Sequence, residues 1–266
     1  MSKSRLFASA ALLGLISASL IYAQDKSARL TFDVVSIKPS APGVAGGGIK
    51  PMPGGQEYVA QNLPVRTVMS VLYRVPLRQI VGGPDWLDTD RFEIDAKSEH
   101  SYNLDDLHTM FQNLLTDEFK LQFHKENREG PVYALVLDKS GSKMKVNGSD
   151  QKFDIPITRG RDGVATGTRV PIAYLCWWLG QNLQQDQRPV IDKTGLDKLY
   201  DFTLSFRPNL PPNFNPDNLP SDLPAGFLDR PTLFDALKEQ LGLKLEPQKG
   251  PVEFFVIDHA EKPSGN

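Results

Sequence analysis

The chain of 266 residues presents one order of predicted elements twice, and this internal repeat limits its possible folds more than any other feature. Residues 63–72 and 170–179 both have a proline at their second position, followed by apolar residues at helical spacing. A proline is tolerated at a helix start because the N–H that it lacks would have no partner there. Each segment therefore predicts an amphipathic helix that begins at a proline.

The same succession of elements follows each of these helices. An apolar strand with a turn comes first, then a strand of alternating polarity, then a second amphipathic helix. Two more strands, with a Gly-Pro pair between them, predict a closing hairpin. In the first copy these segments are 80–84, 91–96, the helix of Leu107, Phe111 and Leu115, and 119–136; in the second they are 190–195, 201–206, the helix of Leu233, Leu237 and Leu241, and 243–256.

Strands of alternating polarity need one covered face, and the two helices of each copy can supply that cover. The repeat thus predicts an α+β fold of two tandem, related β-α-β-β-α-β-β modules, with small mixed sheets covered by helices. We expect the first module at 24–146, with an N-terminal strand at 30–37 and a Gly/Pro-rich loop at 39–55. The second module is expected at 147–266, with a proline-rich insertion at 207–231.

The first 23 residues have the pattern of a secretory signal peptide. Lys3 and Arg5 precede an apolar stretch at 6–21, and Ala23 is a small residue of the kind at which signal peptidase cleaves. A membrane anchor would need an apolar run of about 20 residues, whereas this run is shorter and is interrupted by serines. We therefore expect cleavage after Ala23, a secreted or periplasmic protein, and no membrane span once the signal is removed.

The composition excludes several kinds of site. A single cysteine leaves no disulfide framework and no cysteine-based metal site, and the four histidines form no ligand set of known spacing. We therefore expect neither a metal nor another cofactor. The net charge of −2 provides no basic field for nucleic acid. Cys176, inside the apolar helix at 170–179, is expected to be a buried and inert thiol.

Three short strings, at 101–103, 140–143 and 193–195, match motifs of the penicillin-binding serine enzymes but not their arrangement. The Ser-x-x-Lys string follows a predicted strand and includes a glycine turn, so its lysine has no reason to face the serine. The Ser-x-Asn string also precedes it, in reverse of the expected order. Asp105 and Asp106 lie at a predicted helix start, where capping and the macrodipole explain carboxylates without catalysis.

Two tryptophans, Trp86 and Trp177, are the candidate contact residues for a ligand or partner. Either indole could stack on a bound molecule. Trp86 aligns with Leu196 in the other copy, so core packing is the favoured alternative for it. Trp177 aligns with Ser70, and we therefore expect its face to be open.

Four segments of the chain carry a family resemblance. They are FDVVSIKPS at 32–40, GGPDWL at 82–87, RPVIDKTGL at 188–196 and VIDH at 256–259. Together they resemble an exported protein family with a domain of unknown function, associated with soil bacteria and expanded in Acidobacteria. The resemblance implies relatives that are sometimes fused to sensor-type zinc metallopeptidases, and it implies no catalytic residues. At fold level only, the element order resembles a tandem of the short periplasmic module at the N-termini of secretins and TonB-dependent transducers.

Together these features favour an exported, non-enzymatic binding or interaction protein, because export and duplication come without an assembled catalytic set. An envelope protein or a peptide is the expected partner, added to a sheet edge or contacting the proline-rich loop. One alternative is an extracellular hydrolase that gathers carboxylates and His124 or His259 from separate segments. Another is an ancillary sensor domain of a cell-envelope signalling system. Neither the ligand nor the oligomeric state is predicted.

Overall fold

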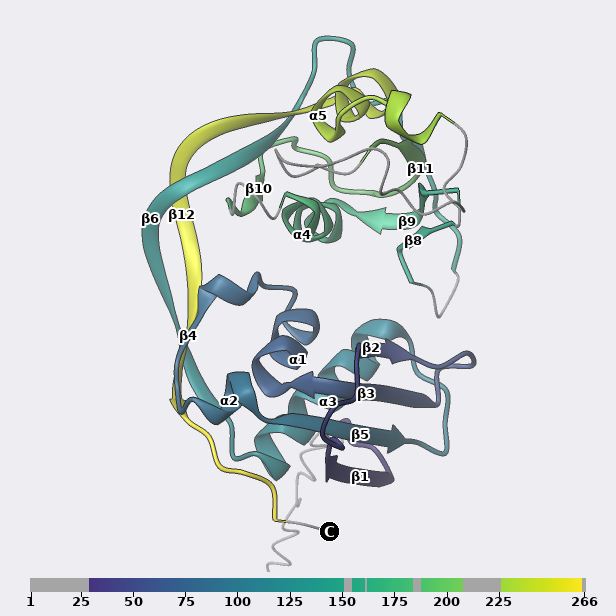
Figure 1. Ribbon diagram of the computed structural model, residues 1–266. Helices are drawn as coiled ribbons and strands as arrows, with labels where there is room; N and C mark the ends of the chain where they lie inside the picture. Colours follow the sequence, from purple (N-terminus) through teal and green to yellow (C-terminus); the bar gives the residue numbers. More distant parts are fainter. Residues whose placement is uncertain (1–28, 151–154, 161, 184–187, 208–225, 265–266) are drawn as a thin grey trace, which may run out of the picture.

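The computed structural model describes residues 29–150, 155–160, 162–183, 188–207 and 226–264. The predicted signal peptide and most of the proline-rich insertion lie outside these residues. Within the described part, no helix has both the length and the hydropathy that crossing a bilayer requires. The chain forms two lobes joined along one side by a long pair of strands (Figure 1). The mixture of small sheets and short helices confirms the predicted α+β class.

The first lobe consists of β1 (Val34–Pro39), β2 (Gly48–Pro51), β3 (Glu57–Pro64), α1 (Val65–Leu72), α2 (Trp86–Thr89), β5 (Arg91–Lys97) and α3 (Leu104–Glu118). Its strands form an antiparallel sheet in the order β1-β5-β3-β2. Helix α1 follows Pro64 directly, as the sequence predicts. Strand β2 forms inside the segment predicted as a Gly/Pro-rich loop. Helix α3 packs on the sheet through Phe111, whose ring centroid lies 5.2 Å from that of Tyr58 in β3.

The second lobe repeats this plan around a sheet in the order β7-β11-β9-β8. Its helix α4 follows Pro171, and its last helix begins as α5 and continues as the π-helical turn η4. Its elements are β7 (Lys145–Val146), β8 (Ile157–Arg159), β9 (Val164–Pro171), α4 (Ile172–Asn182), β11 (Leu199–Ser205), η3 (Phe227–Asp229), α5 (Leu233–Ala236) and η4 (Leu237–Leu241).

Two long strands, β6 (Gln122–Leu137) and β12 (Leu243–His259), connect the lobes (Figure 1). They pair antiparallel along their whole length, and we call this pair the ribbon. Short strands extend it: β4 (Ile80–Gly82), which follows the turn η1 (Leu77–Gln79), pairs parallel with β12, and β10 (Val190–Asp192) pairs parallel with β6. Each lobe therefore contributes one long strand that reaches the other lobe.

The predicted closing hairpins are wrong, because each is one continuous strand. The Gly-Pro pairs lie at the middle of the ribbon, where Gly130 is opposite Gly250. A Cβ at Gly130 would lie 3.2 Å from the side chain of Val252, so the glycine permits close approach of the strands rather than a turn. At Pro131, β6 pairs only with β12 among the described residues, so its other side is an edge of the sheet. A proline is accepted at such an edge because the backbone N–H that it lacks would have no strand partner there.

A β-bulge precedes the first helix in both lobes. Asn62 and Arg169 have positive φ angles of 52° and 51°, and each donates its backbone N–H to a carboxylate on the neighbouring strand. The acceptors are Glu93 at 3.1 Å and Asp201 at 2.9 Å. Glu93 thus corresponds to Asp201. Matching the segments 91–96 and 201–206 from their first residues would instead place Asp201 against position 91, so the sequence alignment is shifted by two residues. A shift of two residues preserves which side chains face the core, so alternation alone does not reveal it.

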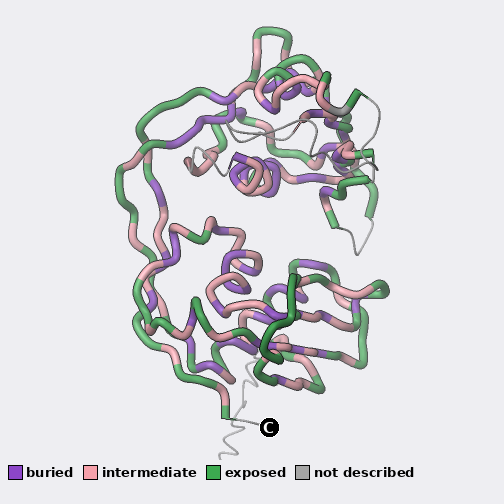
Figure 2. Tube along the Cα trace, viewed as in Figure 1, coloured by how far each residue is buried: buried purple, intermediate pink, exposed green. Residues whose placement is uncertain are grey.

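Each lobe has its own hydrophobic core, and the ribbon contributes to both. Phe255 and Ile257 of β12 are buried in the core of the first lobe. Tyr133 and Leu135 of β6 are buried in the core of the second. Figure 2 shows the buried residues gathered in two centres, one in each lobe. The two lobes share an element order, but because they exchange strands, each core needs side chains from the other half of the chain.

His108 on α3 is buried, and its Nε2 lies 2.9 Å from the Tyr58 hydroxyl. Burial, with a smaller contribution from Arg74, lowers the pKa of His108 to about 4. Because this folded pKa lies below that of an unfolded histidine, the unfolded chain takes up the proton first as the pH falls. We expect His108 to account for a loss of roughly 2–3 kcal/mol of stability between pH 7 and pH 4.5.

Urea denaturation at the two pH values checks this prediction. The His108→Gln variant should lose correspondingly less stability on acidification than the wild type. The matched control is His100→Gln, at an exposed position. An identical acid sensitivity of wild type and His108→Gln would show that His108 is not protonated on unfolding.

Candidate functional site: the cleft between the lobes

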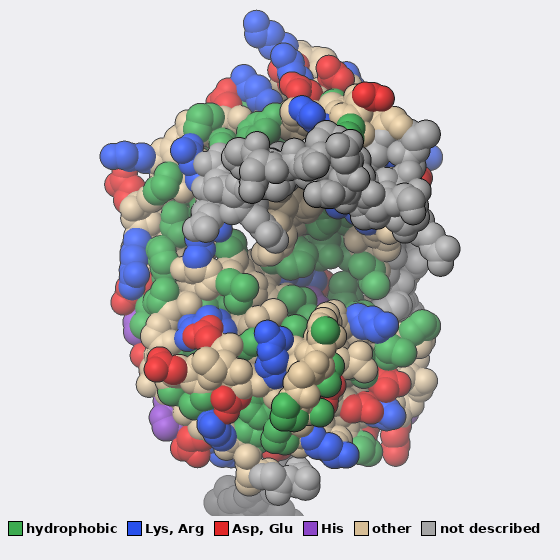
Figure 3. All heavy atoms as spheres, viewed as in Figure 1, with side chains coloured by type: hydrophobic (Ala, Val, Ile, Leu, Met, Phe, Trp, Pro, Cys, Tyr) green, Lys and Arg blue, Asp and Glu red, His purple; other side chains and the backbone are tan. Residues whose placement is uncertain are grey.

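A cavity lies between the two lobes, and Figure 3 shows the molecule hollowed there, with hydrophobic side chains in the visible wall. Its outer part has a volume of about 730 Å³ and is lined from both lobes. An inner part of about 230 Å³ extends to the ribbon. Arg74 lines both parts. We call them the outer cleft and the inner cleft.

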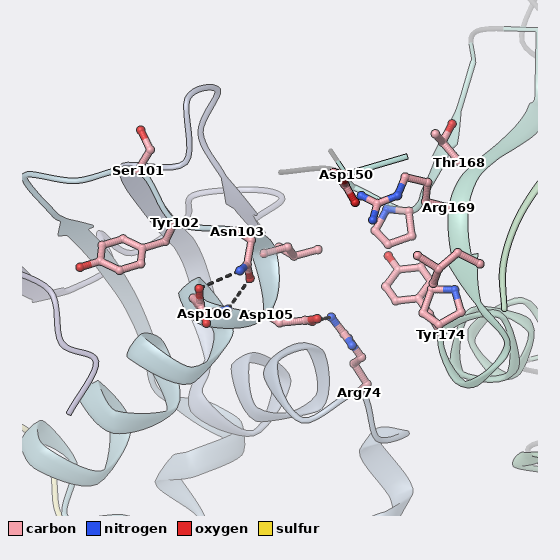
Figure 4. A pocket seen from close by; sticks show the side chains of 14 residues that line it. Arg74, Ser101, Tyr102, Asn103, Asp105, Asp106, Asp150, Thr168, Arg169 and Tyr174 are labelled. Carbon is pink, nitrogen blue, oxygen red and sulfur yellow. Dashed lines mark hydrogen bonds and ion pairs between the residues drawn. The ribbon is translucent and has the colours of Figure 1, made fainter. Parts of the chain in front are cut away.

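Arg74 connects the lobes across the outer cleft (Figure 4). It follows α1 with a positive φ of 52° and forms an ion pair with Asp105 at the start of α3. Its guanidinium also lies over the ring of Tyr174 on α4, 5.2 Å from the centroid. The Arg74 Nε atom is buried and has no hydrogen-bond partner among the described residues. Arg74 is therefore a cation held between a carboxylate and an aromatic face, and its buried Nε–H donor has no partner among the described residues.

The acidic pair at the start of α3 has the structural role that the sequence suggests. Asn103 caps the helix by accepting a hydrogen bond from the N–H of Asp106, and its amide donates to the Asp106 carboxylate at 2.7 Å. Asp105 pairs with Arg74. The two carboxylates therefore serve the helix cap and an ion pair within the first lobe that holds Arg74 at the cleft.

The opposite wall of the outer cleft belongs to the second lobe. Arg169 lines it at the bulge before α4, and Figure 4 shows its guanidinium beside Asp150. Tyr174 lies deeper, and burial raises its pKa while Arg74 lowers it. The cleft therefore presents charges of both signs at its mouth and aromatic surface further inside.

The inner cleft is lined by the turn η1, by α4 and by the ribbon. Trp177 of α4 has a buried Nε1 without a hydrogen-bond partner in the described part of the chain. Gln79 of η1 is 5% exposed, and its Oε1 is likewise buried and unpartnered among the described residues. Leaving such groups unsatisfied costs about 1–3 kcal/mol each. Native structures keep few of them, and those that remain call for an explanation.

Cys176 also lines the inner cleft, and it is the buried thiol that the sequence predicts. Burial, and to a smaller extent Asp192, raises its pKa to about 12. A thiol with such a pKa carries almost no thiolate at neutral pH, and it is therefore a poor nucleophile and a poor metal ligand. Across the described residues, no group of three or more His, Cys, Asp or Glu side chains is arranged to hold a metal ion.

The two candidate tryptophans occupy different environments. Trp177 lies in the inner cleft, with its ring 5.2 Å from that of Tyr174. Trp86 on α2 is half-buried at the first core, 6.4 Å from both the Phe92 and the Phe119 rings. The core-packing alternative for Trp86 agrees with these contacts. A ligand contact by either tryptophan stays a prediction.

His124 and His259 lie at the end of the ribbon in the first lobe. His124 Nδ1 lies 2.8 Å from the Asp258 carboxylate, and its Nε2 lies 3.2 Å from Glu126. These hydrogen bonds raise the pKa of His124, that from Asp258 most. His259 contacts Glu261 at 2.9 Å. Both histidines are about half exposed, and neither is among the described residues that line the cleft.

Three residues of the cleft have no signal in the sequence: Arg74, Gln79 and Tyr174. Arg74 and Gln79 stand in the connection between a helix and a strand, where polar residues are ordinary. Tyr174 lies on a helix with so many apolar residues that one more aromatic side chain predicts only burial. These residues line the cleft only because the two lobes lie against each other, and local sequence patterns do not predict that arrangement.

Comparison with protein families gives one match, over residues 66–260. The comparisons with curated proteins and with solved structures give no match. The matched region begins in α1 and ends just after β12, so it includes the second lobe, the whole ribbon and the first lobe from α1 onward, but not the strands β1, β2 and β3. Since it covers most of the chain, the protein belongs to the family described as "Protein of unknown function (DUF3738)".

Proposed function

We propose that this is an exported, non-enzymatic binding protein that holds its ligand between its two lobes. The observation that carries the proposal is the inner cleft, where Trp177 and Gln79 present unsatisfied polar atoms from opposite lobes. A ligand that completes those hydrogen bonds removes their desolvation penalty, so binding gains from groups that are costly in the free protein. The combined cleft is within the size range of small-molecule sites.

The described residues of the cleft favour binding over catalysis. The thiol of Cys176 is inert, and the carboxylates of Asp105 and Asp106 are engaged in an ion pair and a helix cap. His108 approaches this region but is buried against Tyr58 and stays neutral. General acid–base chemistry needs a group free to exchange a proton with the substrate.

A thermal-shift screen of the full mature chain tests the proposal. The compounds are amino acids, short peptides, monosaccharides and oligosaccharides at millimolar concentration. A ligand present at 100 times its dissociation constant stabilises the folded state by about 2.7 kcal/mol, which raises the melting temperature by several degrees. At least one class should produce such a shift. A flat response across all four classes would contradict a small-molecule binding role.

The hydrolase alternative has one specific observation in its favour, the contact of His124 with Asp258 and Glu126. A histidine oriented by one carboxylate is a possible general base. His124→Gln should abolish any hydrolysis of extracellular polysaccharide or peptide by the purified protein if this site is catalytic.

The sensor alternative would use the interlobe cleft itself as the ligand site. A gene for a membrane-bound metallopeptidase next to the gene for this protein would favour that alternative.

A further inference from the structure

Resting on the proposed function, we infer that the inner cleft recognises an amide group of the ligand. The amide carbonyl accepts a hydrogen bond from Trp177 Nε1, and the amide N–H donates one to Gln79 Oε1. Peptides and sugars with an acetamido group share this chemistry. The inference deepens the proposed function by naming the chemical class that the site takes.

The first requirement of the site is a hydrogen-bond acceptor. An indole N–H is only a donor, and Trp177 Nε1 is buried without a partner among the described residues. The indole is held by its packing against Tyr174 on the preceding turn of α4. The group that completes the Trp177 hydrogen bond must therefore carry a carbonyl, carboxylate or hydroxyl oxygen.

The second requirement is a hydrogen-bond donor. Gln79 Nε2 donates to the backbone carbonyl of Glu253 in the ribbon at 2.6 Å. Rotating the amide by 180° would set two oxygens against each other, so this contact fixes its orientation. Gln79 Oε1 is therefore the free acceptor, and it is buried beside the inner cleft. The group that completes it must carry an N–H or O–H.

An amide meets both requirements with two separate atoms of one planar group, whereas a hydroxyl, which is also donor and acceptor, must meet them with a single oxygen. A carboxylate or an ester offers acceptors alone, and an ammonium group offers donors alone. A trans amide carries its C=O and its N–H on opposite sides, which suits partners that stand on opposite lobes. Apart from Arg74 and Glu253, the rest of the wall is formed by apolar and aromatic residues, including Tyr73 and Phe255, which can cover the amide plane.

Calorimetric titration with matched pairs of probes tests the inference. Dialanine is compared with alanyl-lactate, in which an ester oxygen replaces the amide N–H, and N-acetylglucosamine is compared with glucose. We expect at least one amide probe to bind ten-fold or more tightly than its counterpart, and the pair that responds identifies a peptide or an acetamido sugar as the source.

In the same experiment, Trp177, which supplies the hydrogen-bond donor, is replaced. Trp177→Phe keeps an aromatic ring and removes the N–H that is unsatisfied in the free protein, together with part of the indole surface. Loss of the buried donor favours folding and loss of packing opposes it, so the melting temperature should stay close to that of the wild type. Its affinity for the amide probe should fall ten-fold or more. The control is Trp178→Phe, because Trp178 packs against Phe206 and is not among the described residues lining the cleft. Its affinity should stay within two-fold of the wild type.

The outcomes separate the two proposals. Equal affinities within both probe pairs, or full affinity in Trp177→Phe, would overturn the amide inference while a ligand found in the screen keeps the binding proposal. Absence of binding by every probe and every compound of the screen would overturn both.

Discussion

Replacing Phe111 with alanine should lower the free energy of unfolding by about 3–5 kcal/mol, in one transition that includes both lobes. Phe111 is completely buried in the first lobe, where its ring packs edge-to-face on Tyr58 and Phe32 at 5.2 and 6.1 Å. Its removal leaves a cavity that the sheet and α3 cannot close. The effect should reach the second lobe because β6 and β12 complete both cores.

Urea denaturation followed by tryptophan fluorescence measures this coupling. Trp86 reports on the first lobe, and Trp177 and Trp178 report on the second. In variants that keep only one set of indoles, both reporters should shift to the same lower midpoint on Phe111→Ala. The control Val146→Ala, at a position 51% exposed, should change stability by less than about 0.5 kcal/mol. A shift of the Trp86 signal alone would mean that the lobes unfold independently.

Placing leucine at Gly180 should reduce ligand affinity a hundred-fold or more without unfolding the protein. Gly180 lies on α4 and lines the inner cleft, and no described atom comes within 4 Å of the position of an added Cβ. A side chain at this position lies one turn after Trp177, on the same face of the helix. It would therefore fill the space in front of the indole N–H, while removal of a helical glycine favours folding by up to about 1 kcal/mol.

Calorimetry with the most strongly stabilising compound of the screen checks this prediction, together with a melting curve of Gly180→Leu. The matched control is Gln181→Leu, which adds the same side chain one residue further, at a position that is not among the described lining of the cleft. It should bind like the wild type. Undiminished binding by a stably folded Gly180→Leu would place the ligand outside the inner cleft.

Much of the local structure is predictable from the sequence, because short-range physics decides it. Pro64 and Pro171 mark the starts of α1 and α4, and Asn103 starts α3, each for a reason that concerns only neighbouring residues. The alternating strands β5 and β11 also appear where the pattern puts them. The alignment of those two strands is wrong by two residues, because a period of two gives no information about such a shift.

The exchange of strands and the cleft are beyond local patterns. The Gly-Pro pairs at 130–131 and 250–251 fit a turn and a proline-containing edge strand equally well. Which strand β6 pairs with depends on a segment more than a hundred residues away. Arg74 and Gln79 are ordinary polar residues of a connection until the second lobe and the ribbon bury them.

Hydrogen–deuterium exchange of the chain from Gln24 onward, with and without the most stabilising compound of the screen, tests whether the ligand is held by both lobes. We expect added protection in two separate segments, the η1 region at 73–80 and helix α4 at 173–182, since both line the inner cleft. Protection confined to one lobe, or centred on the His124 end of the ribbon, would contradict it.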